Sequence, residues 1–470
     1  MSAGRVRRIH FIGIGGTGMS GLAEVLLTMH YEVSGSDSSR SEVTDRLASL
    51  GARVEIGHDA EHLGQADLVV FSSAVPKDNP EVRAARRRGL PLLKRGEMLA
   101  ELMRLRYGIA IAGAHGKTTT TSLVGHLLAR ADLDPTVVVG GRLKMVGGAS
   151  GGNARLGAGQ YLVAEADESD GSFLELFPTI AVVTNIDREH LDHYPGLVEI
   201  RRAFLQFMKQ VPFYGVSIVC GDDPNVRSIL PRLRKRVLTY GFGAGNHLRA
   251  SEVVTEGYRQ SFLVEDHGRA LGRAVVNLPG RHNVLNALAA IGVARELDVP
   301  ESICLSGLGD FGGVGRRFEL RGEAGGVRVI DDYGHHPTEL AAVLATARSV
   351  HPGRLVVLFQ PHRYSRTQAL AREFAEVLAE ADLLVLADVY AAGEKPIAGV
   401  SSDLIADQIG VLTDRPVVRV RDRAAALERV PPLLRPGDLL LTLGAGDVSR
   451  WGEPILAQLE AGVLARGNGR

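Results

Sequence analysis

Two glycine-rich loops, each lying between an apolar run and a helix-like run, most constrain how this chain can fold. They are GIGGTG at 13–18 and GAHGKTT at 113–119. Glycine lets the backbone turn sharply there, and the N–H groups at the start of the following helix attract an anion. Two such junctions predict an α/β chain built on parallel sheets, with two sites for phosphate-containing ligands.

The first loop has the GxGxxG spacing of dinucleotide-binding folds. Gly13, Gly15 and Gly18 form the pattern, and Asp37 follows about twenty residues later, where an acid is expected to bind a ribose. Alone, this spacing predicts an NAD-dependent oxidoreductase. It reports only a diphosphate and a ribose, however, and a UDP-sugar carries both, so the loop does not distinguish the two ligands.

The second loop has the chemistry of an ATP site. Its N–H groups can wrap phosphate oxygens, Lys117 can reach the β- and γ-phosphates, and the Thr118 hydroxyl can hold Mg²⁺. The loop is shorter than the strict Walker pattern and is a variant of it. We therefore predict ATP and Mg²⁺ as cofactors. A dehydrogenase has no use for an ATP loop, whereas a ligase that activates a UDP-linked substrate needs both loops.

Acidic and histidine residues follow two strand-like runs behind the second loop, in VAEADESD (163–170) and TNIDREHLDHY (184–194). Ligands of open α/β sheets bind at the carboxyl ends of strands. We therefore predict that Glu165 and His190 hold the metal. Zinc is not expected, because no cysteine or close histidine pair completes a tetrahedral set. The other acids of the first segment are interpreted as solvated loop residues: Asp167, Glu168 and Asp170.

Length and pattern predict about three domains, because 470 residues exceed what one hydrophobic core organises. We place them at 1–105, 106–315 and 316–470, the first and third being Rossmann-like. The glycine-rich stretch 140–159 is expected to form a loop or hairpin. Buried strands are expected at 9–14, 31–35, 68–71, 108–112, 161–164, 181–184, 216–219, 327–331, 355–359, 383–387 and 439–443.

Composition excludes several classes of protein. Lys+Arg and Asp+Glu both number 54, so net charge recruits neither nucleic acid nor an anionic membrane. No apolar run approaches the roughly 20 residues of a membrane span. The two cysteines have no metal or redox spacing, which favours a reducing, cytoplasmic location.

Seven segments, occurring in order between about residue 9 and residue 449, together resemble the Mur ligases. Each is modest alone, but their joint occurrence is specific. The resemblance implies a Rossmann-like UDP-sugar-binding domain, a P-loop-type ATPase domain and a Rossmann-like amino-acid-binding domain. The segments are HFIGIGGTGMSGLAE (10–24), GAHGKTTTT (113–121), EADESDGSFL (165–174), TNIDREHLDHY (184–194), GRHNVLNALAA (280–290), DDYGHHPTE (331–339) and QPHRYSRT (360–367).

The resemblance also implies a reaction. ATP phosphorylates a muramoyl carboxylate, and an amino-acid amine attacks the acyl phosphate to give an amide, ADP and phosphate. The match is nearest to members that join L-alanine to UDP-N-acetylmuramate. We expect this chain to be a monomer or a weak homodimer. A muropeptide-recycling ligase remains an alternative, whereas a folylpolyglutamate synthetase does not predict the first loop. A non-catalytic nucleotide sensor would be expected to lose Lys117, Glu165 or His190.

Site roles follow from the resemblance, motif by motif. The catalytic residues it implies are Lys117, Glu165, His190, His335 and Arg363. The residues it implies for ATP are Gly113, Ala114, His115, Gly116, Lys117, Thr118, Thr119, Asn283, Asn286 and Arg317. Those for the UDP-sugar and the amino acid are Gly13, Gly15, Gly16, Gly18, Asp37, Ser72, Ser73, Tyr333, His362, Arg363 and Arg366. The metal ligands it implies are Thr118, Glu165 and His190.

Some of these residues also have an interpretation from the pattern itself. Asn283 and Asn286 share a helix face, and contacting adenine and capping the helix are equally compatible with that spacing. Arg363 and Arg366 follow a strand, where a pair of guanidinium groups suits a carboxylate. His336 is interpreted as structural.

Two further expectations concern single positions. Asp332 is expected to orient the incoming amine or a neighbouring arginine. Several Mur relatives carry a carbamoylated lysine on the helix after HLD. Here the helix at 200–210 offers only Lys209, out of register, with Phe204 nearer to that position. No modified lysine is therefore transferred to this chain.

Overall fold

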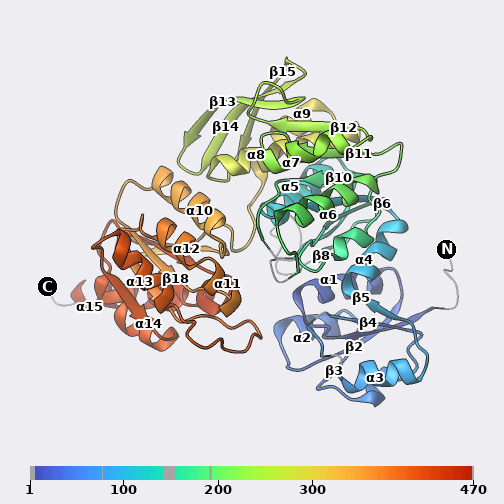
Figure 1. Cartoon of the computed structure of the whole chain (residues 1–470), viewed down its shortest axis with the longest axis horizontal. Helices are drawn as coiled ribbons and strands as arrows, with labels where there is room; N and C mark the ends of the chain where they lie inside the picture. Colours follow the sequence, from blue (N-terminus) through green and yellow to red (C-terminus); the bar gives the residue numbers. More distant parts are fainter. Residues whose placement is uncertain (1–5, 73, 77, 141–153, 190–192, 468–470) are drawn as a thin grey trace. The chain divides into compact units, whose positions relative to one another are not determined.

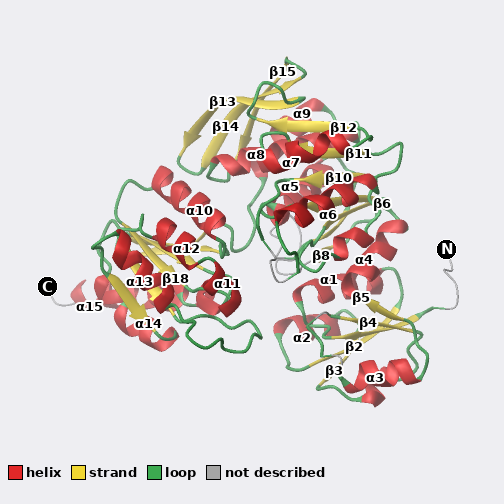
Figure 2. Ribbon diagram, in the orientation of Figure 1, coloured by secondary structure: helices red, strands yellow, loops and turns green. Residues whose placement is uncertain are grey.

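The computed structural model describes residues 6–72, 74–76, 78–140, 154–189 and 193–467. It divides the chain into two compact units. One contains residues 1–254, 261–277 and 283–314, and the other contains residues 255–260, 278–282 and 315–470. Each unit is built on twisted sheets flanked by helices (Figures 1 and 2). The predicted α/β class is confirmed.

The N-terminal sheet is parallel, with the strand order β3-β2-β1-β4-β5. The strand order reverses between β1 and β4, and ligands of open α/β sheets bind at such a switch point. The first glycine loop follows β1, and Ser72 follows β4. The strands are β1 (Arg8–Ile12), β2 (Glu32–Asp37), β3 (Arg53–Ile56), β4 (Leu68–Phe71) and β5 (Leu92–Lys94), and the helices are α1 (Thr17–Thr28), α2 (Glu42–Ser49), α3 (Pro80–Arg87) and α4 (Arg95–Arg104).

A buried carboxylate supports the first glycine loop. Glu81 on α3 is fully buried, accepts a hydrogen bond from Ser36 Oγ at 2.8 Å and lies 2.9 Å from His10 Nε2. The backbone oxygen of Ser36 accepts the N–H groups of Gly13 and Ile14 at 2.8 and 3.0 Å. Burial opposes the charge, but the hydrogen bonds from His10 and Ser36 outweigh it and lower the pKa of Glu81.

The central sheet has the strand order β15-β14-β13-β12-β11-β10-β6-β9-β7-β8. β6, β10 and β11 are runs of small and β-branched residues that are almost wholly buried, as expected for parallel strands covered on both faces. The strands are β6 (Tyr107–Ala112), β7 (Thr136–Val138), β8 (Ala154–Arg155), β9 (Tyr161–Glu165), β10 (Ile180–Val183), β11 (Val216–Cys220), β12 (Val237–Gly241), β13 (Leu248–Glu256), β14 (Arg259–Asp266) and β15 (Arg269–Val276). The helices are α5 (Lys117–Arg130), α6 (Leu197–Lys209), α7 (Pro224–Ile229), α8 (Arg281–Glu296) and α9 (Glu301–Ser306).

The sequence does not predict the strands from β12 to β15. Two-residue turns connect β13 to β14 and β14 to β15, and Gly257, His267 and Gly268 adopt positive φ values of 57°, 48° and 81° in them. Continuous apolar runs mark the buried parallel strands, but β14 alternates buried and partly exposed residues. Such alternation is typical of hairpins with one solvated face, and a search for apolar runs misses it.

The C-terminal sheet has the strand order β16-β17-β21-β18-β19-β20, with β16 antiparallel to β17 and the other pairs parallel. The strands expected at 327–331, 355–359, 383–387 and 439–443 are all present. The strands are β16 (Glu319–Ala324), β17 (Val327–Asp332), β18 (Leu355–Phe359), β19 (Leu383–Ala387), β20 (Val417–Val420) and β21 (Leu439–Leu443). The helices are α10 (Pro337–Val350), α11 (Tyr364–Ala369), α12 (Ala371–Leu378), α13 (Asp403–Leu412), α14 (Arg423–Arg429) and α15 (Gly452–Gly467).

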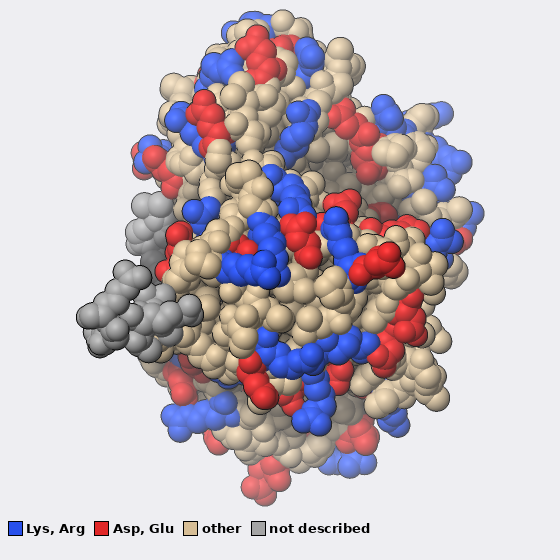
Figure 3. All heavy atoms as spheres, turned by 90° about the vertical axis from the view of Figure 1, so that its left-hand side faces the viewer, with Lys and Arg blue, Asp and Glu red and all other residues tan. Residues whose placement is uncertain are grey.

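The surface carries both signs of charge. On the face drawn in Figure 3, Lys and Arg side chains are interspersed with Asp and Glu side chains. Among the residues that the structure describes, no helix combines the length and the apolarity needed to cross a bilayer.

The support of the first glycine loop is testable by removing its carboxylate. Glu81→Ala leaves buried polar partners without their anion, so the opening free energy of the β1 and β2 amides should fall by about 3 kcal/mol. Native-state hydrogen exchange measures this quantity. Glu61→Ala, at an exposed position nearby, is the matched control and should change it by less than about 0.5 kcal/mol. Equal effects of the two substitutions would contradict the assigned support.

Candidate functional site

The second glycine loop leaves the carboxyl end of a central strand. β6 pairs with β10 on one side and β9 on the other, with Ala112 opposite Val183 and Ile111 opposite Glu165. Because the three strands are parallel, their carboxyl ends share one edge of the sheet. The acidic segment after β9 and the polar segment after β10 therefore meet around the loop, as the sequence predicts.

Two loop positions admit only glycine. Gly113 has a φ of 139°, and a Cβ there would collide with Thr184 Oγ1. Gly116 has a φ of 82°, and a Cβ would lie 2.6 Å from Asn286 Oδ1. The backbone thus runs where no side chain fits, which leaves its N–H groups as the recognition surface for an anion.

Side chains after β10 fasten the loop. Thr184 Oγ1 and Asn185 Nδ2 donate to the backbone oxygen of His115 at 2.6 and 3.0 Å. Asn185 Oδ1 accepts the N–H of His115 at 2.8 Å. The His115 ring lies with Nε2 2.9 Å from Asp187 Oδ2. The loop is therefore held in shape by the neighbouring strand end.

Lys117 folds back into the loop. Its Nζ donates to the backbone oxygens of Gly113 and Ala114 at 2.5 and 3.2 Å and to Glu168 Oε1 at 2.7 Å. Burial disfavours the ammonium charge, but Glu168 and the nearby Glu189 outweigh that effect and raise the pKa of Lys117 above its ordinary value. Lys117 is therefore a permanent cation placed where phosphates would approach the loop.

The prediction for Glu168 was wrong. Glu168 is only 2% exposed and forms an ion pair with Lys117, so it is not a solvated loop residue. Sequence spacing does not reveal this, because the chain after β9 turns inward: Tyr194 Oη donates to the backbone oxygen of Glu168 at 2.9 Å. A buried lysine requires an anion nearby, and this requirement is the one signal that could have indicated a paired carboxylate after β9.

Asp170 is exposed as expected, and Asp167 is partly exposed but forms an ion pair. Asp167 Oδ2 pairs with Arg95 Nη2 at 3.1 Å. Burial opposes the charge, but Arg95 and Lys117 outweigh it and lower the pKa of Asp167. Arg95 is a functional candidate that the sequence does not indicate, and its Cδ lies 2.8 Å from where a Cβ on Gly18 would be.

The predicted metal ligands provide oxygen donors. Thr118 lies buried in the first turn of α5, with Thr119 beside it, and Glu165 ends β9. A hydroxyl and a carboxylate suit Mg²⁺, which prefers hard oxygen ligands. His190, the third predicted ligand, lies outside the described residues.

The asparagine pair packs against the phosphate loop. Asn286 Oδ1 accepts from Thr120 Oγ1 at 3.1 Å, and Asn286 Nδ2 donates to Asn283 Oδ1 at 3.0 Å. Both asparagines are buried on α8. They therefore join α8 to α5 at the loop, and neither of these two bonds is a helix cap.

The first glycine loop is held by Asp37. Asp37 Oδ2 accepts the N–H of Gly15 at 2.9 Å. Gly13 has a φ of 80°, and a Cβ there would lie 3.6 Å from Cβ of Ser72, across the switch point. Gly16 is the N-cap of α1 and has no side-chain cap, so the helix start is open to an anion. Ser73 lies outside the described residues.

The second unit has a row of aromatic rings. Tyr333 contacts His335 with ring centroids 5.2 Å apart, His335 contacts His362 at 5.8 Å, and His362 is stacked on Tyr390 at 5.7 Å and 14°. His335 Nδ1 also lies 3.1 Å from Glu339. The three predicted rings come together, and Tyr390 is an addition that the sequence does not indicate.

The predicted arginine pair borders this row. Arg363 is the N-cap of α11 and has a φ of 71°. Arg366 Nη1 lies 3.4 Å from His362 Nδ1. Burial first, then His335 and the nearby arginines, lower the pKa of His362 to about 3. His362 is therefore neutral at pH 7, and its Nδ1 accepts from Arg366.

Arg317, predicted to contact ATP, lies in the second unit over an aromatic ring. Its guanidinium is 5.3 Å from the Tyr333 ring centre, and Nη1 is 3.7 Å from Glu339 Oε1. Arg316 lies on the same ring at 4.8 Å. Two cations therefore border the aromatic row at this end.

Asp332 and His336 fix local backbone. Asp332 accepts the N–H groups of Phe318 and Gly334, both at 2.7 Å. Burial raises the pKa of Asp332 to about 6, against the opposing effect of Arg317 and these N–H groups. His336 caps α10 by accepting the N–H of Thr338 at 3.4 Å. This cap supports the structural interpretation of His336.

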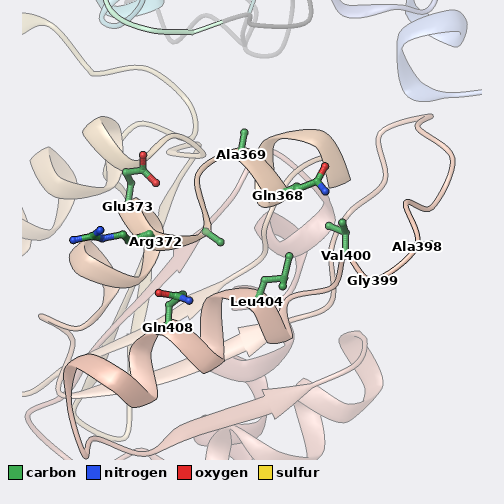
Figure 4. A pocket seen from close by; sticks show the side chains of 10 residues that line it. Gln368, Ala369, Arg372, Glu373, Ala398, Gly399, Val400, Leu404 and Gln408 are labelled. Carbon is green, nitrogen blue, oxygen red and sulfur yellow. The ribbon is translucent and has the colours of Figure 1, made fainter.

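A cavity of about 480 Å³ lies elsewhere in the second unit (Figure 4). It opens between α11, α12, α13 and the segment at 398–400, and its lining includes Gln368, Arg372 and Gln408. None of the predicted site residues is among its lining residues. It therefore lies beside the helix that carries Arg366 without including either arginine of the pair.

Comparisons with known proteins agree along the whole chain. The Mur ligase family catalytic domain matches residues 8–107, the Mur ligase middle domain matches residues 111–294, and the Mur ligase glutamate ligase domain matches residues 316–446. The UDP-N-acetylmuramate–L-alanine ligase of Geobacter sp. (strain M21) is 54% identical over 459 residues, which are 97% of this chain and 99% of that protein.

Solved structures give the same result. The UDP-N-acetylmuramate-alanine ligase MurC of Thermotoga maritima superimposes with a TM-score of 0.81 at 29% identity, covering 97% of this chain and 99% of that one. A murein peptide ligase of Psychrobacter arcticus 273-4 has a TM-score of 0.71 at 23% identity, with the same coverage. The second likeness shows the fold alone.

The Lys117–Glu168 pair is testable by a conservative substitution. Glu168→Gln keeps the shape but removes the charge that balances Lys117. Loss of a charged hydrogen bond costs roughly 1.5–3 kcal/mol, so kcat of the ATP-dependent reaction should fall about ten- to a hundredfold. Asp170→Asn, in the same segment but exposed, should stay within about threefold of wild type. Steady-state kinetics at saturating ATP decide between them, and equal values for both variants would contradict the pairing.

The neutral state of His362 predicts a pH effect. The folded chain binds the His362 proton only near pH 3, whereas the ordinary value is 6.5. The unfolding free energy should therefore fall as pH falls from about 6.5 towards 3, because the unfolded chain takes up the proton first. Nitrogen-15 NMR of the imidazoles, assigned with His362→Asn, should show no His362 titration between pH 8 and 5. A midpoint between pH 6 and 7 would contradict the burial argument.

Proposed function

The chain belongs to the Mur ligase family, and we propose that it joins L-alanine to the carboxylate of UDP-N-acetylmuramate at the expense of ATP, in peptidoglycan precursor synthesis. We assign residues 1–105 to the UDP-sugar, 106–315 to ATP and 316–470 to the amino acid. Both cysteines are buried thiols among the described residues, which supports a cytoplasmic location.

One observation carries the proposal: the second glycine loop presents Lys117 at a sheet edge that also carries Glu165 and Glu168. A cation beside the backbone N–H groups at the start of α5 suits the β- and γ-phosphates of ATP. Carboxylates at the same edge suit the metal that accompanies ATP. An oxidoreductase would leave this arrangement unexplained.

The chemistry begins with the acceptor carboxylate. A carboxylate oxygen attacks the γ-phosphorus, the bond between that phosphorus and the β–γ bridging oxygen breaks, and ADP leaves. Charge spreads over the transferred phosphoryl oxygens, and we assign Lys117 and the loop N–H groups to neutralise it. The carboxylate becomes an acyl phosphate, whose phosphate is a good leaving group.

Mg²⁺ fits the oxygen donors at this edge. We assign Thr118, Glu165 and, outside the described residues, His190 to hold it. When bound, the ion reduces the negative charge on the phosphates. Asn283 and Asn286 are assigned to the adenine side, because they are joined to α5 at the loop.

The second step joins the amine to the activated carbonyl. The alanine nitrogen attacks the acyl carbon, the carbon–oxygen bond to phosphate breaks, and one proton leaves the nitrogen. We assign Arg363 and Arg366 to the alanine carboxylate, because a guanidinium fork binds a carboxylate through two parallel hydrogen bonds. With Nδ1 donating to the backbone oxygen of Tyr333 at 3.2 Å, His335 has a lone pair on Nε2, and we assign that nitrogen to take the proton.

A recycling ligase that attaches a peptide is the alternative within the family. It would use the same two glycine loops and differ in the space around the arginine pair. The named activity of the relative at 54% identity favours L-alanine. The likeness to a murein peptide ligase supports the fold only.

Phosphate release from MgATP, with each substrate omitted in turn, tests the proposal. Release should require both UDP-N-acetylmuramate and L-alanine. Lys117→Ala should abolish release while leaving UDP-N-acetylmuramate binding, measured by calorimetry, within about threefold. Lys209→Ala, at an exposed position on α6, is the matched control and should behave as wild type. Release that needed a peptide instead of L-alanine would favour the recycling ligase.

A further inference from the structure

An aromatic ring that the assigned roles do not use stands at the end of the ring row. Tyr390 follows β19, and its ring lies nearly parallel to that of His362, with centroids 5.7 Å apart. His362 in turn contacts Arg366, one of the two arginines assigned to the amino-acid carboxylate. The Tyr390 ring and the Arg366 guanidinium therefore both lie next to His362, in the region assigned to the amino acid.

The backbone of Tyr390 is clamped to the arginine pair. Its N–H donates to the oxygen of Pro361 at 2.8 Å, and its own oxygen accepts the N–H of Arg363 at 2.8 Å. Arg363 has a φ of 71°, which a non-glycine residue adopts only when its surroundings hold it there. The clamp therefore fixes Tyr390 relative to the start of the helix that carries both arginines.

Two further contacts make this corner rigid. Glu394, four residues after Tyr390, accepts from the Ser365 hydroxyl at 2.6 Å and from its N–H at 3.1 Å. A Cβ on Gly446 would lie 2.8 Å from Cγ of Tyr390, so the backbone there approaches the ring closely. The ring is thus packed closely against backbone, yet Tyr390 remains 40% exposed.

We propose that Tyr390 determines specificity, its ring forming the rigid wall that limits the side chain of the incoming amino acid to the size of a methyl group. This inference rests on the proposed function and names the part of the same site that selects the amino acid. Selection by size requires a wall that does not yield, and the clamp, Glu394 and Gly446 supply that rigidity. A wall of this kind discriminates against one extra methylene by roughly 10- to 200-fold.

The test compares amino acids that differ by single carbons. For wild type, Tyr390→Ala, Tyr390→Leu and Tyr390→Phe, kcat/KM is measured with L-alanine, L-2-aminobutyrate and L-valine, at saturating MgATP and UDP-N-acetylmuramate. Tyr390→Ala should raise the ratio of kcat/KM for 2-aminobutyrate over alanine by about tenfold or more. Tyr390→Leu should raise it less, and Tyr390→Phe, which keeps the ring, should stay within about threefold of wild type.

The outcomes separate the inference from the proposed function. A wild type that released no phosphate with L-alanine would overturn both. If wild type uses L-alanine but Tyr390→Ala and Tyr390→Leu raise the KM of every amino acid equally, Tyr390 only supports the arginine pair and the specificity role is wrong. If Tyr390→Ala does not fold, Tyr390→Leu decides by the same ratio. An unchanged ratio in a folded Tyr390→Leu overturns the inference.

Discussion

The structure around the second glycine loop depends on placing a lysine charge where water is largely excluded. Moving an ammonium group out of water costs several kcal/mol unless anions or carbonyl oxygens replace the lost solvent. Lys117 obtains these from Gly113, Ala114 and Glu168. Glu168 comes from the segment after β9, so the lysine is balanced only when β6 and β9 are paired. Sheet pairing and the charge of the site are therefore formed together.

The shape of the loop depends on β10, the neighbour of β6 on the side away from β9. Thr184 and Asn185, after β10, hold the backbone of His115. Position 113 accepts only glycine, because Thr184 Oγ1 occupies the place where a Cβ would lie. Three parallel strands thus each contribute one part: the loop, the anion and the fastening groups. Parallel pairing makes this possible, because it brings the carboxyl ends of strands distant in sequence to one edge.

The sequence predicts those features that a local pattern determines. Apolar runs locate the parallel strands, and the glycine spacing locates both loops. The inward path of Glu168 depends on Tyr194, some residues later in the chain, and no local pattern reveals it. Likewise Tyr390 joins the ring row only because β18 and β19 are adjacent in the sheet. The sequence predicts that Asp37 binds a ribose, and in the structure its Oδ2 accepts the N–H of Gly15.

The two proposed binding regions, one in each unit, use different kinds of recognition. Phosphate is met mainly by backbone N–H groups, whose positions follow from the glycines and the strand order and are insensitive to most side-chain changes. The amino acid is met by side chains, Arg366 and the neutral His362, on a sheet with its own hydrophobic core. Because His362 is uncharged, it can accept from Arg366 without competing for the carboxylate, and the guanidinium keeps its full charge for the substrate. The strained backbone of Arg363 is then the cost of aiming both arginines from one short helix, and the pairing with Tyr390 is what holds that geometry.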